Sequence, residues 1–199
     1  MNITGLILLQ KKSMPIMKNT FVFRELNEIP DSHLQAYADD KLWAIRGFDD
    51  RTKISDNPYK IKNPRLHGFS RGDLPEKFRQ LNGEMDKLEI PKQNRIFLIC
   101  RVFYNEDVDF SGHAFHLGDV IYVDVLKGNR PSGKDWTPDL SFKIPIINNR
   151  PIYSTIEESN LRAHIIQICK DALKFDNKTY LDFTKFKEGY FFYHDLSVH

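Results

Sequence analysis

The stretch YLDFTKFKEGYFFYHDLSVH, residues 180–199, predicts a β-hairpin. Two apolar runs of β-type residues, 180–186 and 190–196, flank a Glu-Gly pair that suits a turn. Asp182 and Asp195 interrupt these runs. Simple alternation explains each acid as the solvent-facing residue of a half-buried strand. As neighbours on adjacent strands, the same acids would offer two carboxylates to one divalent cation, so both interpretations stay open.

Two segments upstream have the periodicity and the end signals of helices. The stronger is YSTIEESNLRAHIIQICKDALKF, residues 153–175, where Ser or Thr at 154–155 and Glu at 157–158 can form a capping box. The other begins with Pro75 in its first turn and runs to about Leu88. The buried face expected for this second helix consists of Phe78, Leu81, Met85 and Leu88.

Segments rich in Val, Ile, Phe and Tyr predict the remaining strands. They cover residues 42–46, 96–104, 114–116, 120–125 and 140–147. A short helix, capped by Asp31 or Ser32, precedes the first of them, and the polar stretch 49–73 predicts a long loop. Strands, then a helix, then a hairpin do not give regular βαβ alternation. We therefore predict an α+β fold with a mostly antiparallel sheet and flanking helices.

The composition limits the class of protein but does not identify a function. A chain of 199 residues with 41% hydrophobic content suits one domain or two closely packed subdomains. The 29 basic and 27 acidic residues nearly cancel, so charge gives no clear signal for nucleic acid or membrane. Cys100 and Cys169 lie in apolar runs, which predicts buried thiols in a reducing compartment. We expect a cytoplasmic protein.

No local motif names a chemistry outright. GxxxxGK(S/T), GxGxxG, HExxH and paired CxxC motifs are all absent from the sequence. Arg46 ends an apolar strand, where its guanidinium needs an anion or carbonyl groups, and a structural salt bridge explains it equally well. His113 and His116 are three residues apart in a strand, which puts them on opposite faces and argues against a shared metal. The loop GNRPSGKDWTPD, residues 128–139, carries Lys134 and suits either phosphate contacts or an ordinary connection.

The order of several weak motifs resembles the nucleotide-binding domain of phosphoenolpyruvate synthase and pyruvate phosphate dikinase, in the ATP-grasp superfamily. That family has a strand, an SG-x-A/M-F segment, a strand that ends in an acid, a glycine-bearing loop and a T-P-D. Here the order is matched by Ser111-Gly112, Ala114-Phe115, Asp124, Gly128, Ser132-Gly133 and Thr137-Pro138-Asp139. LWAIRG, residues 42–47, is similar to the family's VAVRSS strand, and the hairpin is similar to its final strands after a shift of one residue.

The resemblance implies an ATP-grasp-like domain over residues 21–199, with 1–20 as a leader or an added strand. It implies ATP and Mg²⁺ as cofactors, and a nucleotide and an unknown acceptor as partners, with a protein partner as a further option. The reaction would be that of an ATP-dependent kinase or ligase. The implied residues are Arg46 and Arg101 for catalysis, Arg46, Lys134, Asp124 and Asp195 for the nucleotide, and Asp182 and Asp195 for the metal.

Two alternatives stay open at this point. Gly47 and Phe48 replace the family's two serines, and Leu196-Ser197 stands where its terminal arginine would be. A non-catalytic module that binds a nucleotide or a protein would tolerate these departures. An ADP-ribosyltransferase-like enzyme would use Arg46 and Ser154-Thr155, with Glu188 as its acid, although Ser154-Thr155 suits a helix cap better.

Overall fold

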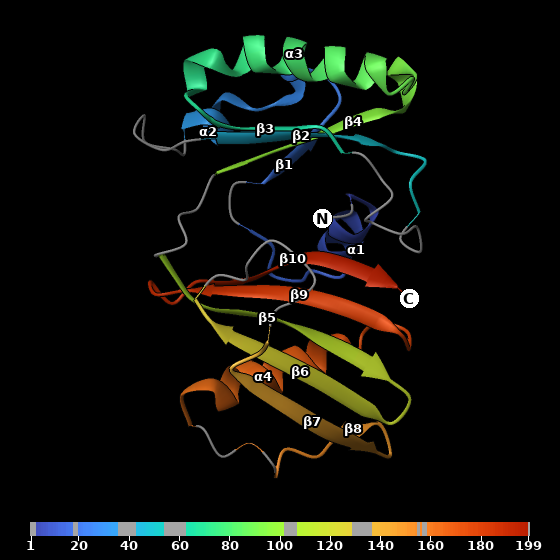
Figure 1. Ribbon diagram of the computed structural model, residues 1–199, viewed down its shortest axis with the longest axis vertical. Coiled ribbons are helices and arrows are strands. Elements are labelled where there is room, and N and C mark those ends of the chain that lie inside the picture. Colours follow the sequence, from blue (N-terminus) through green and yellow to red (C-terminus); the bar gives the residue numbers. More distant parts are fainter. Residues whose placement is uncertain are drawn as a thin grey trace. The chain divides into compact units, whose positions relative to one another are not determined.

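The computed structural model describes residues 3–17, 20–35, 43–53, 63–101, 107–128, 137–154, 156 and 159–198. The chain divides into two compact units. The large unit combines Met1–Ile16 with Tyr104–His199, and the small unit is Met17–Phe103. Each unit has its own sheet with helices packed against it (Figure 1). The architecture is α+β, as predicted.

The large unit is built on an antiparallel sheet of six strands in the order β10-β9-β5-β6-β7-β8. Its strands are β5 (Val108–Leu117), β6 (Val120–Lys127), β7 (Leu140–Ile147), β8 (Arg150–Pro151), β9 (Thr179–Phe186) and β10 (Phe191–Val198). Helix α4 (Ser159–Ala172) contacts β5, β6 and β9, whereas helix α1 (Ile3–Lys11) contacts β10. The predicted hairpin is confirmed as β9 and β10, and Gly189 takes the left-handed backbone conformation of its turn at φ 88°.

The small unit has an antiparallel sheet of four strands in the order β1-β4-β2-β3. Its strands are β1 (Phe21–Phe23), β2 (Trp43–Asp49), β3 (Arg65–Phe69) and β4 (Arg95–Arg101). Its helices are α2 (Asp31–Gln35), α3 (Leu74–Lys87) and the 3₁₀ turns η1 (Leu26–Glu28), η2 (Arg71–Asp73) and η3 (Lys92–Asn94). Strand β4 lies between two others, which confirms a buried central strand over its described part.

Helix α3 covers one face of the small sheet, and the face predicted for it is confirmed. Leu81 and Met85 are fully buried in a cluster with core residues of β2 and β4, while Phe78 and Leu88 pack at its margin. A Cβ on Gly47 would overlap the sulfur of Met85. Glycine at this point of β2 therefore allows the helix to approach the sheet closely.

The core of the large unit contains a polar link between β10 and α4. The hydroxyl of Tyr193 donates a hydrogen bond of 2.7 Å to Oδ2 of Asp171, and Nζ of Lys174 lies 2.7 Å from Oδ1 of the same carboxylate. Tyr193 and Asp171 are both buried. Burial, and then the bond to Asp171, raise the pKa of Tyr193 above its ordinary value. A buried carboxylate is tolerated here because it has both a hydroxyl donor and a cation as partners.

Three segments differ from the sequence predictions. Part of the stretch predicted as a long loop, Arg65–Phe69, is strand β3 at the sheet edge, where most of its side chains are exposed. Helix α4 begins at Ser159, and most of the predicted capping box lies outside the described residues. Ile3–Lys11, for which a leader or an added strand was expected, forms a helix with Ile3, Leu6 and Leu9 buried. The domain start at residue 21 stays a prediction.

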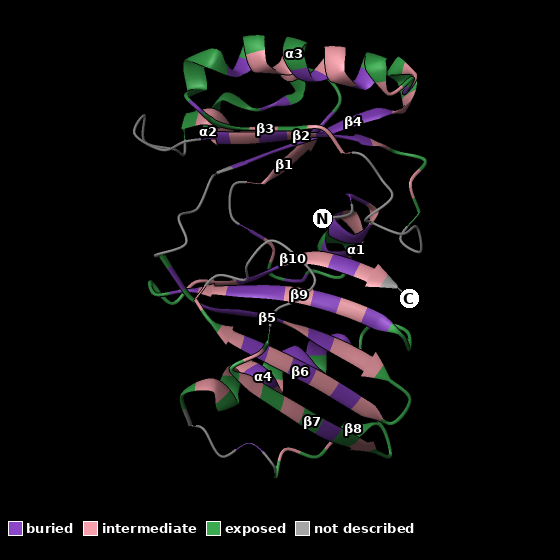
Figure 2. Ribbon diagram, viewed as in Figure 1, coloured by how far each residue is buried: buried purple, intermediate pink, exposed green. Residues whose placement is uncertain are grey.

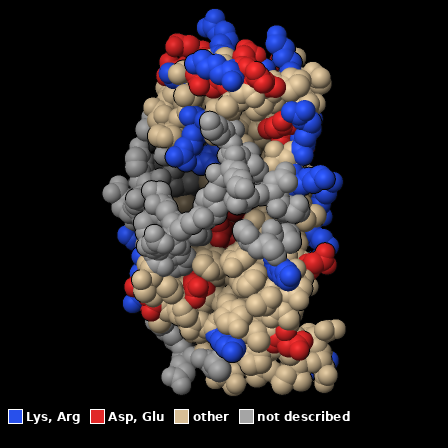
Figure 3. All heavy atoms as spheres, turned by 45° about the vertical axis from the view of Figure 1, so that its right-hand side comes forward, with Lys and Arg blue, Asp and Glu red and all other residues tan. Residues whose placement is uncertain are grey.

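Burial follows the alternation of the strands, and charge is mixed over the surface. Buried and half-buried residues alternate along β9 and β6 (Figure 2). Cys100 and Cys169 are free and buried, as predicted, and burial raises the pKa of Cys100 to about 11. Acidic and basic side chains are interspersed on the face in Figure 3. No helix within the described residues has the length and apolar character needed to cross a bilayer.

The close contact between β5 and β6 predicts a marked difference between two glycines. A Cβ on Gly112 would overlap the backbone carbonyl oxygen of Asp124, whereas a Cβ on Gly83, which is half-buried in α3, meets nothing within 4 Å. We expect Gly112→Ala to lower the free energy of unfolding by about 1–3 kcal/mol. Gly83→Ala should raise it by about 0.5–1 kcal/mol through helix propensity. Urea unfolding of both variants measures the two changes, and equal stability of the two would refute the packing at Gly112.

Candidate functional site

Polar side chains form a row across the large sheet. In the strand register, Asp195 of β10 is opposite Asp182 of β9, and Asp182 is opposite His113 of β5. His113 is in turn opposite Asp124 of β6, which is opposite Ser141 of β7. Residues directly opposite each other project from the same face, with Cβ atoms about 5 Å apart. We call Asp195, Asp182, His113, Asp124 and Ser141 the polar row.

The polar row lies on the face of the sheet away from α4. Its neighbours along the strands, including Leu181, Phe183 and Ala114, are fully buried and belong to the other face. There His164 of α4 contacts the ring of Phe110 at 5.5 Å between centroids. The apolar side chains thus project from the face that α4 covers, and the polar side chains project from the opposite face.

Contacts hold the middle of the polar row in place. The hydroxyl of Ser141 donates a hydrogen bond of 2.6 Å to Oδ1 of Asp124, and Nε2 of His113 lies 3.3 Å from Oδ2 of the same carboxylate. The imidazole of His113 also lies 5.7 Å from the ring of Tyr180. Burial, and secondly the negative charge of Asp124, raise the pKa of Tyr180. One carboxylate therefore influences polar groups on three neighbouring strands.

A β-bulge determines which face Asp195 occupies. The register of β10 against β9 shifts between Tyr193, which is opposite Phe183, and Asp195, which is opposite Asp182. Strict alternation would put Tyr193 and Asp195 on the same face. The extra residue, His194, lets Tyr193 stay in the core while Asp195 joins the polar row.

Aromatic side chains lie next to the polar row on the same face. The rings of Phe115 and Tyr180 are stacked, with centroids 4.1 Å apart and planes 18° apart. Tyr122 is opposite Phe115 on the neighbouring strand, and Nζ of Lys143 lies 5.9 Å from the centroid of the Tyr122 ring. The face thus combines flat apolar surfaces, the cation of Lys143 and several carboxylates.

The metal-binding capacity of this face is limited to few protein ligands. No group of three His, Cys, Asp or Glu side chains within the described residues is arranged to hold a metal ion. Asp182 and Asp195 nevertheless face each other across adjacent strands. Mg²⁺ is commonly bound through one or two carboxylates, with phosphate oxygens and water completing its coordination. The two acids fit that kind of site.

The basic residues predicted for the site do not belong to the polar row. Arg46 is in β2 of the small unit, opposite Leu98 and on the sheet face away from α3, since Gly47 faces that helix. Arg101 ends β4, opposite Trp43, and its side chain lies outside the described residues, as does all of Lys134. The predicted convergence of Arg46 with the acids stays a prediction.

The acids Asp182, Asp195 and Asp124 were predicted from the sequence as candidate site residues, but the side chains around them were not. His113 was interpreted as a surface or half-buried histidine, and it is half-buried with Asp124 beside it. His116 projects from the other face, as its spacing predicted, and its Nε2 lies 3.1 Å from the Gly118 carbonyl oxygen. Strict alternation of side chains along FSGHAFHL, residues 110–117, would have predicted that His113 and Phe115 share one face.

Comparisons with known proteins establish the fold and no closer relationship. No protein-family model and no curated protein matches the sequence. D-alanyl-alanine synthetase A from Vibrio cholerae O1 biovar eltor superposes with a TM-score of 0.52, at 11% identity, over 98% of this chain and 53% of its own. D-alanine-D-alanine ligase from Coxiella burnetii gives a TM-score of 0.50, at 11% identity, over 98% of this chain and 46% of its own.

This chain thus spans about half the length of these two solved structures. At 11% identity their likeness concerns the arrangement of helices and strands alone. One of them is named as a synthetase and the other as a ligase. The chain has an α+β fold of the ATP-grasp type.

Proposed function

We propose that this chain binds ATP with Mg²⁺ and uses it to activate an acceptor in the manner of an ATP-grasp ligase. The observation that carries the proposal is the pair Asp182 and Asp195, opposite each other on the last two strands of an ATP-grasp-type fold. The finer resemblance to the nucleotide-binding domain of phosphoenolpyruvate synthase and pyruvate phosphate dikinase is part of this proposal. In that family an acid at the position of Asp182 helps to hold magnesium.

The acids would hold the metal, and basic residues would hold the phosphates. Asp182 and Asp195 would bind Mg²⁺, which would neutralise charge on the terminal phosphates of ATP. Asp124 is fixed by Ser141 and His113, which supports a role in positioning the nucleotide. Arg46, Arg101 and Lys134 would contact phosphate oxygens, because guanidinium and ammonium groups match the charge of a polyphosphate.

Ligation is favoured over simple phosphorylation of an acceptor. Of the two solved structures reported above, one is named as a D-alanyl-alanine synthetase and the other as a D-alanine-D-alanine ligase. In such a reaction a carboxylate oxygen of the acceptor would attack the γ-phosphorus of ATP, and ADP would leave. A nucleophile would then attack the acyl carbon of the acyl phosphate and release inorganic phosphate. We propose this reaction class without naming the acceptor.

A non-catalytic module is the second candidate. Gly47 and Phe48 replace the serines that follow the strand arginine in the related family, and Leu196-Ser197 replaces its terminal arginine. Such a module would keep the fold and bind a nucleotide or a protein without turnover. The ADP-ribosyltransferase alternative is less well supported, since Glu188 lies in the turn between β9 and β10 rather than on a late strand.

One prediction concerns Asp182 as the proposed metal ligand. Asp182→Asn replaces a carboxylate by an amide of similar shape, so the fold should persist while the charge that holds the cation is lost. We expect Mg-ATP affinity to fall by about tenfold or more. Isothermal titration calorimetry with ATP, in the presence and absence of Mg²⁺, measures the change.

Asp119→Asn is the matched control, because Asp119 is exposed in the turn between β5 and β6 and is not part of the polar row. Its affinity should equal that of the wild type. If the wild type binds no Mg-ATP, or if Asp182→Asn binds it as tightly as the wild type does, the proposed metal site is wrong. Binding without any turnover would favour the non-catalytic module.

The second prediction concerns Arg46. Arg46→Lys keeps the positive charge but removes the planar fork that binds two phosphate oxygens at once. We expect ATP affinity to fall by about tenfold, with little change in stability. Arg79→Lys, at an exposed position of α3, is the control and should bind ATP like the wild type. Unchanged ATP affinity of Arg46→Lys would remove Arg46 from the proposed site.

A further inference from the structure

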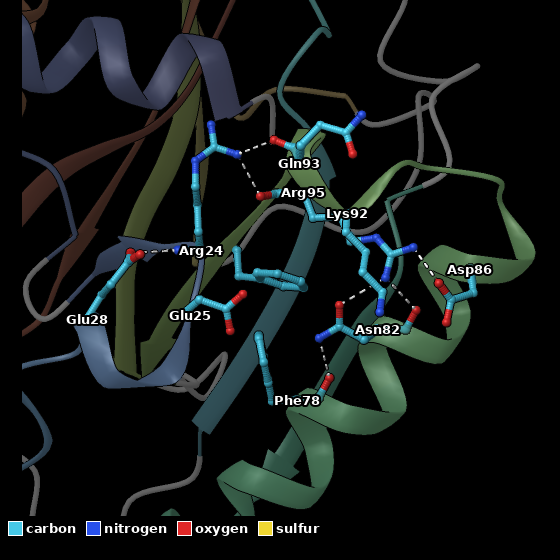
Figure 4. A pocket seen from close by; sticks show the side chains of 10 residues that line it. Arg24, Glu25, Glu28, Phe78, Asn82, Asp86, Lys92, Gln93 and Arg95 are labelled. Atoms are coloured by element: carbon cyan, nitrogen blue, oxygen red, sulfur yellow. Dashed lines mark hydrogen bonds and ion pairs between the residues drawn. The ribbon is translucent and has the colours of Figure 1, made fainter.

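A second candidate binding site lies within the small unit. A cavity of about 570 Å³ opens between η1, α3 and η3 (Figure 4). Small-molecule sites usually have volumes of about 300–1,000 Å³. Every residue that lines the cavity belongs to the small unit. The cavity is therefore a feature of one compact unit.

Two hydrogen-bonded arginines form part of its wall. Arg95 is 5% exposed, and its guanidinium donates hydrogen bonds to the carbonyl oxygen of Ile90, to Oδ1 of Asn82 and to Oδ1 of Asp86. Arg24 donates to the carbonyl oxygens of Gln93 and Arg95 and to Oδ2 of Asp50. Both cations are paired with a carboxylate, so they shape the wall without leaving a net positive charge for a ligand.

Glu25 and Lys92 are the charged side chains of the lining that have no bonding partner within the described residues. Figure 4 shows them on different sides of the cavity, with Glu25 beside η1 and Lys92 on η3. Glu28, also at the η1 side, accepts a hydrogen bond from the backbone N–H of Arg24. The cavity thus offers a negative group on one side and a positive group on the other.

Two aromatic rings also belong to the lining of the cavity. The rings of Phe78 and Phe97 meet edge to face, with centroids 4.7 Å apart, and both line the cavity. Phe97 is buried and Phe78 is half-buried. Of the two rings, Phe78 is the one with exposed apolar surface, and covering that surface contributes roughly 25 cal/mol for each Å² removed from water. A ligand that fits the cavity therefore needs an apolar group as well as two opposite charges.

The cavity is separate from the residues proposed for ATP. It lies on the α3 side of the small sheet, lined by Phe78 and Asn82 of that helix. Arg46 projects from the other face of the same sheet. Binding in the cavity therefore does not depend on whether the proposed ATP site exists.

We propose that this cavity binds a free amino acid with a large apolar side chain. Glu25 pairs with the ammonium group, Lys92 pairs with the carboxylate, and the side chain packs on Phe78. The lining has three acidic residues, Glu25, Glu28 and Asp86, and three basic ones, Arg24, Lys92 and Arg95. A zwitterion with no net charge suits this balance better than a phosphate or a polyamine does.

The test uses L-phenylalanine as the probe, with the purified chain and without ATP or Mg²⁺. Calorimetry compares it with N-acetyl-L-phenylalanine, which lacks the ammonium group, and with L-phenylalanine amide, which lacks the carboxylate. We expect saturable binding of L-phenylalanine and about tenfold weaker binding of each derivative. Chemical shift changes of backbone amides should be centred on residues 24–28, 78–82 and 92–95.

Two variants assign the charged contacts. Glu25→Gln should abolish the preference for L-phenylalanine over the N-acetyl derivative, and Lys92→Met should abolish the preference over the amide. Glu76→Gln and Lys77→Met change the same residue types on α3 outside the cavity and should retain both preferences. Three results would overturn the proposal. L-phenylalanine could show no saturable binding, or all three probes could bind with equal affinity. The control variants could also lose the same preferences as Glu25→Gln and Lys92→Met.

Discussion

The candidate site depends on the register between β9 and β10, which places Asp195 opposite Asp182. That register includes a bulge at His194, without which Asp195 would point to the same side as Tyr193. Two constraints therefore meet within three residues of β10: an aromatic side chain fixed in the core and a carboxylate directed to the opposite face. The bulge satisfies both.

The core of the large unit holds this register in place. Tyr193 is buried and bonded to Asp171 of α4, so a slip of β10 by one residue would break a buried hydrogen bond. Helix α1 packs against the same strand. A Cβ on Gly5 would overlap the carbonyl oxygen of Leu196, so this glycine allows α1 to approach β10 closely. Contacts of α4 and α1 with β10 thus position the strand that carries Asp195.

The sequence predicted the elements that carry a strong apolar signal. Helix α3 was predicted from the period of its apolar residues, and the hairpin and the strands β4 to β7 were predicted from runs of β-branched and aromatic residues. Strand β3 was missed because an edge strand such as RLHGF exposes most of its side chains, and its sequence is therefore hard to distinguish from that of a loop. Helix α1 was missed because its apolar residues continue all round and show little periodicity.

The candidate site was predictable only in part. Asp182, Asp195 and Asp124 were found through their order along the chain, and the structure brings them into one row. The neighbours His113 and Ser141 depend on strand pairing, which a single sequence does not specify residue by residue. The cavity beside α3 depends on side chains from three separate segments, none of which forms a recognisable motif.

The central claim is that a divalent cation and ATP bind together at the polar row. Manganese suits the same carboxylate ligands as magnesium and broadens the NMR signals of nearby nuclei. With Mn²⁺ and a non-hydrolysable ATP analogue both present, the amide signals of residues 181–183 and 194–196 should broaden selectively. Mn²⁺ alone should broaden them much less. Broadening confined to other segments, or equal with and without the analogue, would contradict the account.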